Sequence, residues 1–457
     1  MARRIVWRLG RFFRATSLTL ALAVAAPSNG HPAPSSAIHE GVATCGGLTC
    51  HGRQVASGLV VRQNELITWQ DESSTTGDHS RAWRVLTTPR ARAIADRLGL
   101  GAAQNAPLCL GCHADPVPAR LRGPRFQIAD GVGCEACHGG SSGWLASHYT
   151  VGASHGANVA RGMVALDQPK ARAQVCLNCH FGAVGAGQFV SHRIMSAGHP
   201  RLSFELDLFS SLQRHYDLNA GYARRKELAS GVQTWAIGQA MALDRSLSLF
   251  GNPARGQDGV FPEFYFFDCH SCHRAISDDP GARPVFTVNP ARPIPSGAPP
   301  YNDENMIMLS AAARAVAPGL APRFEADSRA FHLALTKDRG GAARAAAQLA
   351  STSRALAGAF AARGFSRADT FAILEAVLGD ALAPRFTDYA GAAQAVMAID
   401  TLLSSLAAAG QVDQARAASV RPDINRAYAQ ARDPNTFHPA EFRQSLQRVA
   451  LAIRSLQ

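Results

Sequence analysis

CEACH, at residues 134–138, places two cysteines three positions apart and a histidine directly after the second. The same C-x-x-C-H spacing returns in CLGCH (109–113), CLNCH (176–180) and CHSCH (269–273). The last two cysteines lie in CGGLTCH (45–51), where four residues separate them. All ten cysteines of the 457-residue chain therefore fall in five pairs that end in Cys-His, numbered here motif 1 to motif 5 in chain order.

The C-x-x-C-H spacing is the attachment signature of c-type haem. Two thiols form thioethers with the two vinyl groups at one porphyrin edge, and the adjacent histidine then lies beneath the iron. Motif 1 has a longer spacer, in which Gly46 and Gly47 let the loop fold back tightly. We therefore predict about five covalently bound haem c groups, one at each motif.

The motifs define the expected haem-binding residues. The thiols expected to attach haem are Cys45, Cys50, Cys109, Cys112, Cys134, Cys137, Cys176, Cys179, Cys269 and Cys272. The histidines expected to be proximal iron ligands are His51, His113, His138, His180 and His273. A disulfide scaffold and zinc sites are the alternatives, but neither explains why every second cysteine is followed by histidine.

The sixth iron ligand decides what each haem does, because a filled position is typical of an electron carrier and an open one binds substrate. Five of the 16 histidines are the expected proximal ligands, which leaves eleven. Those predicted as distal ligands are His79, His148, His192 and His199. Because Gly198 and Pro200 break any helix joining the last two, we expect these to bind different irons.

The fifth distal ligand stays open on the sequence alone. His270 lies inside motif 5, so it cannot reach its own iron, although it could reach a neighbouring one. His155 and His215 are alternatives, and His39 is a further one. An open coordination position at one haem is the remaining option.

Several longer strings resemble the multihaem c-type cytochromes grouped with the nitrifier tetrahaem cytochrome and hydroxylamine oxidoreductase. The strings are GVATCGGLTCHG, CLGCHA, GVGCEACHGG with WLASH, CLNCH, SHRIMSAGHPRLSFEL and FDCHSCHR, and they span roughly residues 40–280. The resemblance implies closely packed haems, distal ligation by His79, His148, His192 and His199, and periplasmic electron transfer. The chain departs from the best-known members in having five motifs and a C-x4-C-H in the first.

The N-terminus has the order of a secretory signal peptide. Residues 1–14 carry five arginines and no acid, and a short apolar run with Ala23-Val24-Ala25 follows. The run is too short to span a bilayer comfortably, so we expect a soluble periplasmic bacterial protein, with an uncleaved anchor as the alternative. The net charge is +12 without long Lys/Arg runs, which argues against a nucleic-acid partner.

The expected fold class is mainly α. Its parts are a signal peptide (1–25), a linker (26–40), a pentahaem cytochrome c domain (41–285), a Pro-rich linker (286–301) and an α-helical domain (302–457). The cytochrome domain should have little regular structure because haems replace side chains in its core, with helices expected at 80–98, 202–217 and about 221–250. The last part should be an antiparallel bundle, because apolar residues recur with helical spacing from Phe442 to Leu456 and a capping box begins at Ser366. A further helix is expected from Tyr389 to Ala409, ended by Gly410.

The favoured hypothesis is a periplasmic electron carrier with mostly bis-histidine haems and redox proteins as donor and acceptor. No catalytic residue is assigned, so whether the chain is an enzyme stays uncertain. The rival hypothesis is an oxidoreductase that acts on a small nitrogen or sulfur species at one open haem. A third is a structural subunit of a membrane-bound redox complex.

Overall fold

The structure is a computed structural model that describes residues 36–56, 62–201, 203–226, 228–257, 262–273, 278, 292–294, 298–383 and 389–457. The predicted signal peptide (1–25) and His31 lie outside the described residues, as do most of the linker at 26–40 and part of that at 286–301.

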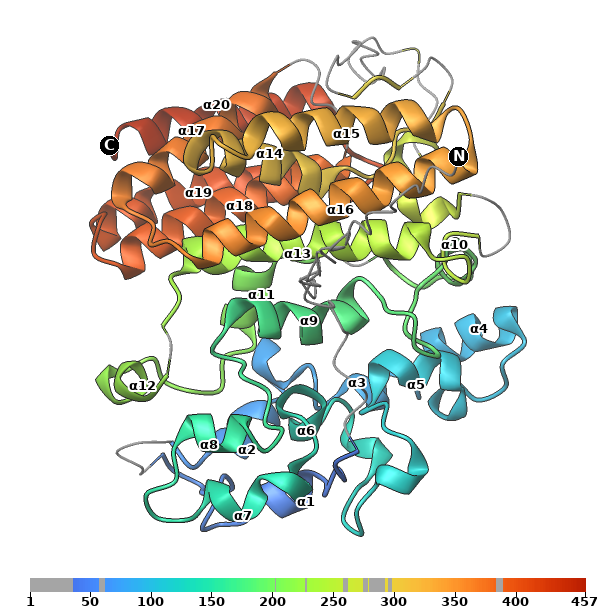
Figure 1. The fold of residues 1–457 in the computed structure, drawn as a ribbon, viewed down its shortest axis with the longest axis vertical. Helices are drawn as coiled ribbons and strands as arrows, with labels where there is room; N and C mark the ends of the chain where they lie inside the picture. The colour runs from blue at the N-terminus through green and yellow to red at the C-terminus, as the bar shows by residue number, and fades with distance from the viewer. Residues whose placement is uncertain are drawn as a thin grey trace, which may run out of the picture. The chain divides into compact units, whose positions relative to one another are not determined.

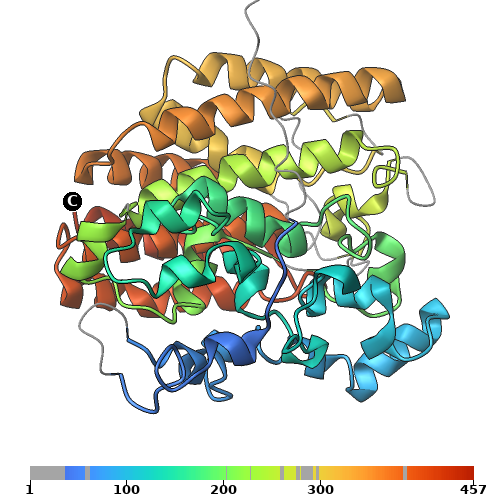
Figure 2. The same cartoon turned by 60° about the horizontal axis from the view of Figure 1, so that its bottom comes forward.

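The cysteine-bearing part of the chain consists of short helices joined by loops (Figures 1 and 2). These helices are α1 (Val42–Cys45), α2 (Glu65–Trp69), α3 (Ala82–Val85), α4 (Pro89–Leu98), α5 (Pro107–His113), α6 (Cys134–His138), α7 (Leu145–His148), α8 (His155–Val159), α9 (Pro169–His180), α10 (His192–Ser196), α11 (Leu206–Leu212) and α12 (Ala220–Arg225). Seven 3-10 helices punctuate the loops: η1 (Thr75–Gly77), η2 (Ala103–Asn105), η3 (Ala119–Leu121), η4 (Ile128–Asp130), η5 (Ser141–Gly143), η6 (Phe264–Phe266) and η7 (Cys269–Ser271). Strand pairing in the described residues is confined to two isolated bridges.

Long helices make up the rest of the chain. They are α13 (Gly231–Gly251), α14 (Glu304–Val316), α15 (Ala321–Leu335), α16 (Arg339–Ala361), α17 (Arg367–Leu382), α18 (Tyr389–Ala408), α19 (Gln414–Gln430) and α20 (Pro439–Arg454). The described chain is therefore mainly α, with a helical C-terminal region, as the sequence predicts.

The largest apolar core lies among α13 to α20. Helix α13 is apolar on most of its surface because it packs on α16, α14 and α18 on one side and on α9 and α11 on the other (Figure 1). By contrast, the described residues of the cysteine-bearing part form only small apolar clusters, one of them around Leu86, Ala95 and Ala103. This part of the chain thus has few large side chains with which to build its own core.

Helix predictions in the C-terminal region are confirmed closely. Ser366 and Asp369 form the capping box that starts α17. The predicted helix from Tyr389 ends at Ala408, and Gly410 follows in the left-handed conformation at φ 67°. Helix α20 buries the predicted apolar face that includes Phe442 and Ile453.

The helices expected at 80–98, 202–217 and 221–250 are shorter or interrupted. The first divides into α3 and α4, because the Thr88 hydroxyl accepts from the Ala91 amide and Pro89 starts a new helix. The Asp78 carboxylate, just before the expected start of this helix, does not cap it but pairs with Arg81. The helix expected at 202–217 is the shorter α11, and the one expected at about 221–250 is divided into α12 and α13.

The residues from Ser36 to Gln457 form one compact unit. Helix α13 belongs to the predicted cytochrome segment, yet its main neighbour is α16 of the C-terminal region. The boundaries predicted at 285 and 302 stay predictions.

Candidate haem-binding sites

A short helix presents each C-x-x-C-H motif. Motifs 2, 3 and 4 lie in α5, α6 and α9, and motif 5 starts in η7. Residues three apart on a helical turn lie on one face, so two cysteines and the adjacent histidine project from neighbouring positions. Motif 1 begins at the end of α1 and continues as a turn, consistent with its longer spacer. All ten cysteines are free thiols.

Every motif histidine faces a second histidine from another segment. The ring centroids are 5.9 Å apart in His51–His148, 6.2 Å in His273–His192, and 6.3 Å in His180–His79, His113–His199 and His138–His215. A metal ion held by one nitrogen of each ring, with bonds of about 2 Å, would separate two centroids by roughly 6 Å. The residues present therefore fit an iron between the members of each pair.

The four predicted distal histidines each lie opposite a motif histidine. His192 is the first residue of the one-turn helix α10 and faces motif 5, and His199, three residues after the helix ends, faces motif 2. Gly198 has a φ of 114°, so the chain turns between them. The prediction that these two bind different irons is thus compatible with the fold and stays a prediction about ligation.

His215, one of the candidates that the sequence left open as the fifth distal ligand, faces His138. The other candidates have different neighbours. The His155 Nε2 atom is 3.0 Å from the Asp167 carboxylate, His39 Nδ1 is 2.6 Å from that of Asp115, and the His270 ring lies against Phe437. No spacing rule marks His215, because it is brought to motif 3 from the loop after α11.

Burial keeps most of these imidazoles neutral. It lowers the pKa of His138 to about 3 and that of His180 to about 4. It also lowers the pKa of His113 and His215, where hydrogen bonds to backbone oppose it. His51 differs, because its hydrogen bond to Glu65 raises its pKa. Neutral imidazole is the form that binds metal, so the buried pairs are prepared for ligation.

Backbone carbonyls orient three of the rings. The Nδ1 atoms of His113, His199 and His215 lie 2.9, 2.8 and 3.2 Å from the carbonyl oxygens of Ala82, Pro200 and Gln213. A carbonyl only accepts, so Nδ1 donates and the Nε2 lone pair is left for a metal.

The Nδ1 atoms of two other motif histidines have different surroundings. His51 Nδ1 is 3.0 Å from the Glu65 carboxylate, a partner that the sequence analysis missed. His180 Nδ1 is buried without a hydrogen-bond partner among the described residues, and the Phe204 ring stacks on its imidazole at 4.6 Å. A buried polar nitrogen of this kind fits a site whose remaining partner is a bound group.

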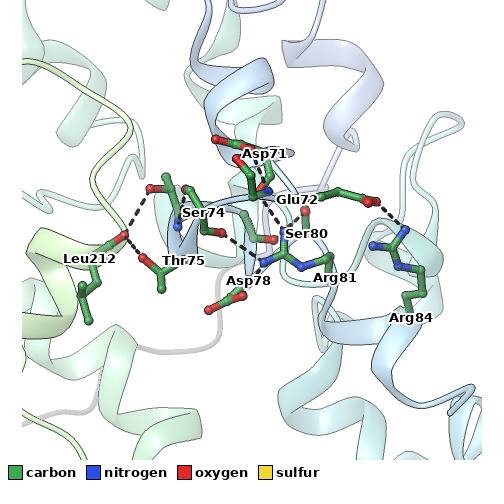
Figure 3. A network of polar contacts seen from close by, with 12 residues as sticks. Asp71, Glu72, Ser74, Thr75, Asp78, Ser80, Arg81, Arg84 and Leu212 are labelled. Atoms are coloured by element: carbon green, nitrogen blue, oxygen red, sulfur yellow. Dashed lines mark hydrogen bonds and ion pairs between the residues drawn. The ribbon is translucent and has the colours of Figure 1, made fainter.

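A polar network fixes the loop that carries His79 (Figure 3). The Arg81 guanidinium donates to the carbonyl oxygens of Asp71 and Ser74, at 2.8 and 3.1 Å, and pairs with Asp78. One side chain thereby closes the loop through two carbonyls and a carboxylate.

The same loop is bonded to the end of α11 (Figure 3). The hydroxyls of Thr75 and Thr76 donate to the Leu212 carbonyl oxygen at 3.1 and 3.2 Å. Leu212 lies three residues before His215. These bonds therefore link the segments that carry His79 and His215, the partners of motifs 4 and 3.

Glu135, inside motif 3, is a buried carboxylate that holds two segments together. It accepts from the amides of Glu40, Gly41 and Ser141 at 2.9, 2.7 and 2.7 Å. The chain just before motif 1 is thereby fixed against motif 3. The sequence analysis assigned no role to this residue, because its partners are backbone amides and two of them lie 94 and 95 positions away.

Thiols of different motifs approach one another. Cys45 lies close to Cys134, where α1 contacts α6, and Cys112 lies close to Cys179, where α5 contacts α9. Burial raises the pKa of the Cys137 thiol to about 12, and the nearby thiols of motif 4 raise it further. Motif 1 thus adjoins motif 3, motif 3 adjoins motif 4, and motif 4 adjoins motif 2.

Cys-His motifs with an opposing histidine at each are the arrangement expected of a c-type cytochrome. The comparisons with known proteins agree: residues 48–139 match the family of cytochrome c554 and c-prime. This stretch includes motifs 2 and 3 and the end of motif 1. The match supports a multihaem c-type cytochrome in electron transfer, with covalently bound haem c. No curated protein and no solved structure matched the chain.

Proposed function

We propose that the chain is a periplasmic electron carrier that holds five haem c groups, each ligated by two histidines. The observation that carries this proposal is the set of five opposed histidine pairs, one at each motif. Haem supplies the one-electron chemistry, and two strong-field imidazoles leave no position at iron for a substrate. The chain's own residues attach, orient and insulate the groups.

The contacts between motifs support an order for electron movement. Neighbouring cysteines give the order: motif 1 lies beside motif 3, motif 3 beside motif 4, and motif 4 beside motif 2. Helix α10 extends the series to motif 5, because it begins at His192, opposite motif 5, and His199, opposite motif 2, follows its end by three residues. We propose that electrons pass along this series, with redox proteins as donor and acceptor at its ends.

The periplasmic location is proposed from the signal-like residues 1–25 and from the predicted haem attachment. Among the described residues, one helix, α18, is long and apolar enough to cross a membrane. Its apolar window is 83% buried inside the protein, as expected for a core helix. A role as a subunit of a membrane-bound redox complex has no such structural support and stays a hypothesis.

Electron paramagnetic resonance of the oxidised protein tests the proposed function against the enzyme hypothesis. Bis-histidine ligation at every haem predicts low-spin iron throughout and no change on adding cyanide or nitrite. A high-spin signal that shifts with either ligand would contradict the carrier and favour an oxidoreductase with one open haem.

A further inference from the structure

Glu205 is a buried carboxylate beside motif 4, and Asp207, two residues later, is a partly buried one. Glu205 is 1% exposed, and its carboxylate accepts from the amides of Asp207 and Leu208 at 2.8 and 2.7 Å, at the start of α11. The Thr401 hydroxyl of α18 donates to it at 2.8 Å. In the described part of the chain, Glu205 has no ion-pair partner, which is unusual for a buried carboxylate.

The segment that carries this pair also forms the wall of a haem site. Phe204 stacks on the His180 imidazole at 4.6 Å, and Phe209 meets the same ring edge-on at 5.6 Å. Glu205 and Asp207 lie between these two phenylalanines in sequence. The carboxyl pair is therefore placed directly behind the wall of the His180–His79 pair, without touching either histidine.

The surroundings favour the protonated form of one of the two acids. Burial raises the pKa of Glu205 to about 7, and the neighbouring Asp207 contributes in the same direction. Burial also raises the pKa of Asp207, which Arg172 and Arg214 oppose. A buried carboxylate with a second, partly buried one two residues away resists double ionisation, so the two hold one proton more readily than separate acids would.

Other charged groups near the two carboxylates either act on Asp207, as Arg172 and Arg214 do, or bond to one another, as Arg421, Asp400 and Tyr428 do. Those facing the two carboxylates are Arg172 of α9, Arg214 after α11, Asp400 of α18, and Arg421 and Tyr428 of α19. Arg421 pairs with Asp400 at 2.7 Å, and the Tyr428 hydroxyl donates to Asp400 at 3.2 Å. Helix α13 approaches Asp207 with Gly231, which carries no charge. Glu205 is thus the group best placed to gain a proton.

We propose that the Glu205–Asp207 pair is a proton-binding site that takes up one proton when the haem at motif 4 receives an electron. This inference rests on the proposed function. The electron comes from a neighbouring haem and reduces iron(III) to iron(II), while a hydronium ion from solvent converts the Glu205 carboxylate to a carboxylic acid. The charge added in this low-dielectric region is then zero, which removes an electrostatic cost of reduction.

The test is a potentiometric titration of the haem-loaded full-length protein at pH values on either side of 7. In the wild type, one haem should have a potential that falls as pH rises, by up to about 59 mV for each tenfold drop in proton concentration. Glu205→Gln, which cannot titrate, should abolish that dependence. Reduced-minus-oxidised infrared spectra should show a carboxylic acid band in the wild type that Glu205→Gln lacks.

Two further variants and a control sharpen the test. Asp207→Asn removes a neighbouring charge, so it should move the pH-dependent range downward. Thr401→Val removes a hydrogen-bond donor to the Glu205 carboxylate, so it should move the pH-dependent range upward. This variant provides the test if Glu205→Gln does not fold. Glu375→Gln, in the exposed pair with Arg454, should leave the range unchanged.

Two outcomes would overturn the inference: the same pH dependence in Glu205→Gln as in the wild type, or an unmoved range in Thr401→Val. Either would leave the proposed function intact, provided that the protein carries five low-spin haems. A protein without haem would overturn the proposed function instead. The number of bound haems is therefore measured before the titration begins.

Discussion

At the scale of single residues, the neighbours of a histidine decide what it is available to do. His155 and His215 follow motif 3 in sequence, and either could have been the fifth distal ligand. His155 faces the Asp167 carboxylate at 3.0 Å, whereas His215 faces His138 with its Nδ1 bonded to a carbonyl oxygen. An imidazole with its Nδ1 so engaged is held ready to bind metal through Nε2.

Replacement of His215 tests this choice of ligand. His215→Ala should leave the haem at motif 3 five-coordinate, so one high-spin haem should appear in the spectrum of the oxidised protein. His155→Ala is the matched control and should keep every haem low-spin. The opposite result, with high-spin iron only in His155→Ala, would show that the fifth pair is misassigned.

His192 and His199 give a second residue-scale prediction. His192→Ala should convert the haem at motif 5 to high spin, and His199→Ala should convert the haem at motif 2, because the two rings face different motif histidines. Electron paramagnetic resonance of both variants and of the double variant measures this. The double variant should have two high-spin haems, and a single one would mean that both histidines serve the same iron.

At the scale of elements, short helices depend on polar side chains that bind distant backbone. Glu135 in α6 is such a residue, because its carboxylate satisfies three buried or half-buried amides around motifs 1 and 3. A buried donor left without its partner costs about 1–3 kcal/mol. The short helices around motifs 1 and 3 have little apolar core of their own, so the loss of such hydrogen bonds is not offset by packing.

Glu135→Ala should therefore lower the free energy of unfolding by about 3 kcal/mol or more, since three amides lose their acceptor. The loosened start of motif 1 should also reduce haem attachment at Cys45 and Cys50. Denaturant unfolding and intact mass measure the two effects. Glu72→Ala, at an exposed ion pair with Arg84, is the control and should behave as the wild type does. Equal stability of the two variants would show that Glu135 has no such role.

The sequence predicts elements well where a helix carries its own signals. The capping box at Ser366, Gly410 after α18, and the apolar face of α20 are local features, and each prediction is confirmed. The end of α3 and the start of α4 also have a local signal, the Thr88-Pro89 pair. The apolar pattern alone does not indicate this interruption. The placing of His215 and the bonds of Glu135 depend on contacts between residues far apart in sequence, which no local pattern contains.

At the scale of the whole molecule, two kinds of core stabilise one compact unit from Ser36 to Gln457. Side chains form the core among α13 to α20, and α13 joins it to the cysteine-bearing part through α9 and α11. The five histidine pairs lie in the part with few large buried side chains, where haem groups would supply the missing apolar volume. The sequence predicts that haem binding is confined to the part before the C-terminal helices, because every cysteine precedes residue 273.

The central claim is that five haems are attached to this chain, one at each Cys-His motif. The intact mass of the exported protein under denaturing conditions tests it most directly, because thioether-linked haem stays on the chain. We expect the mass of the processed polypeptide plus five haem groups. Four haems would exclude the C-x4-C-H of motif 1, and a mass without any haem would contradict the whole account.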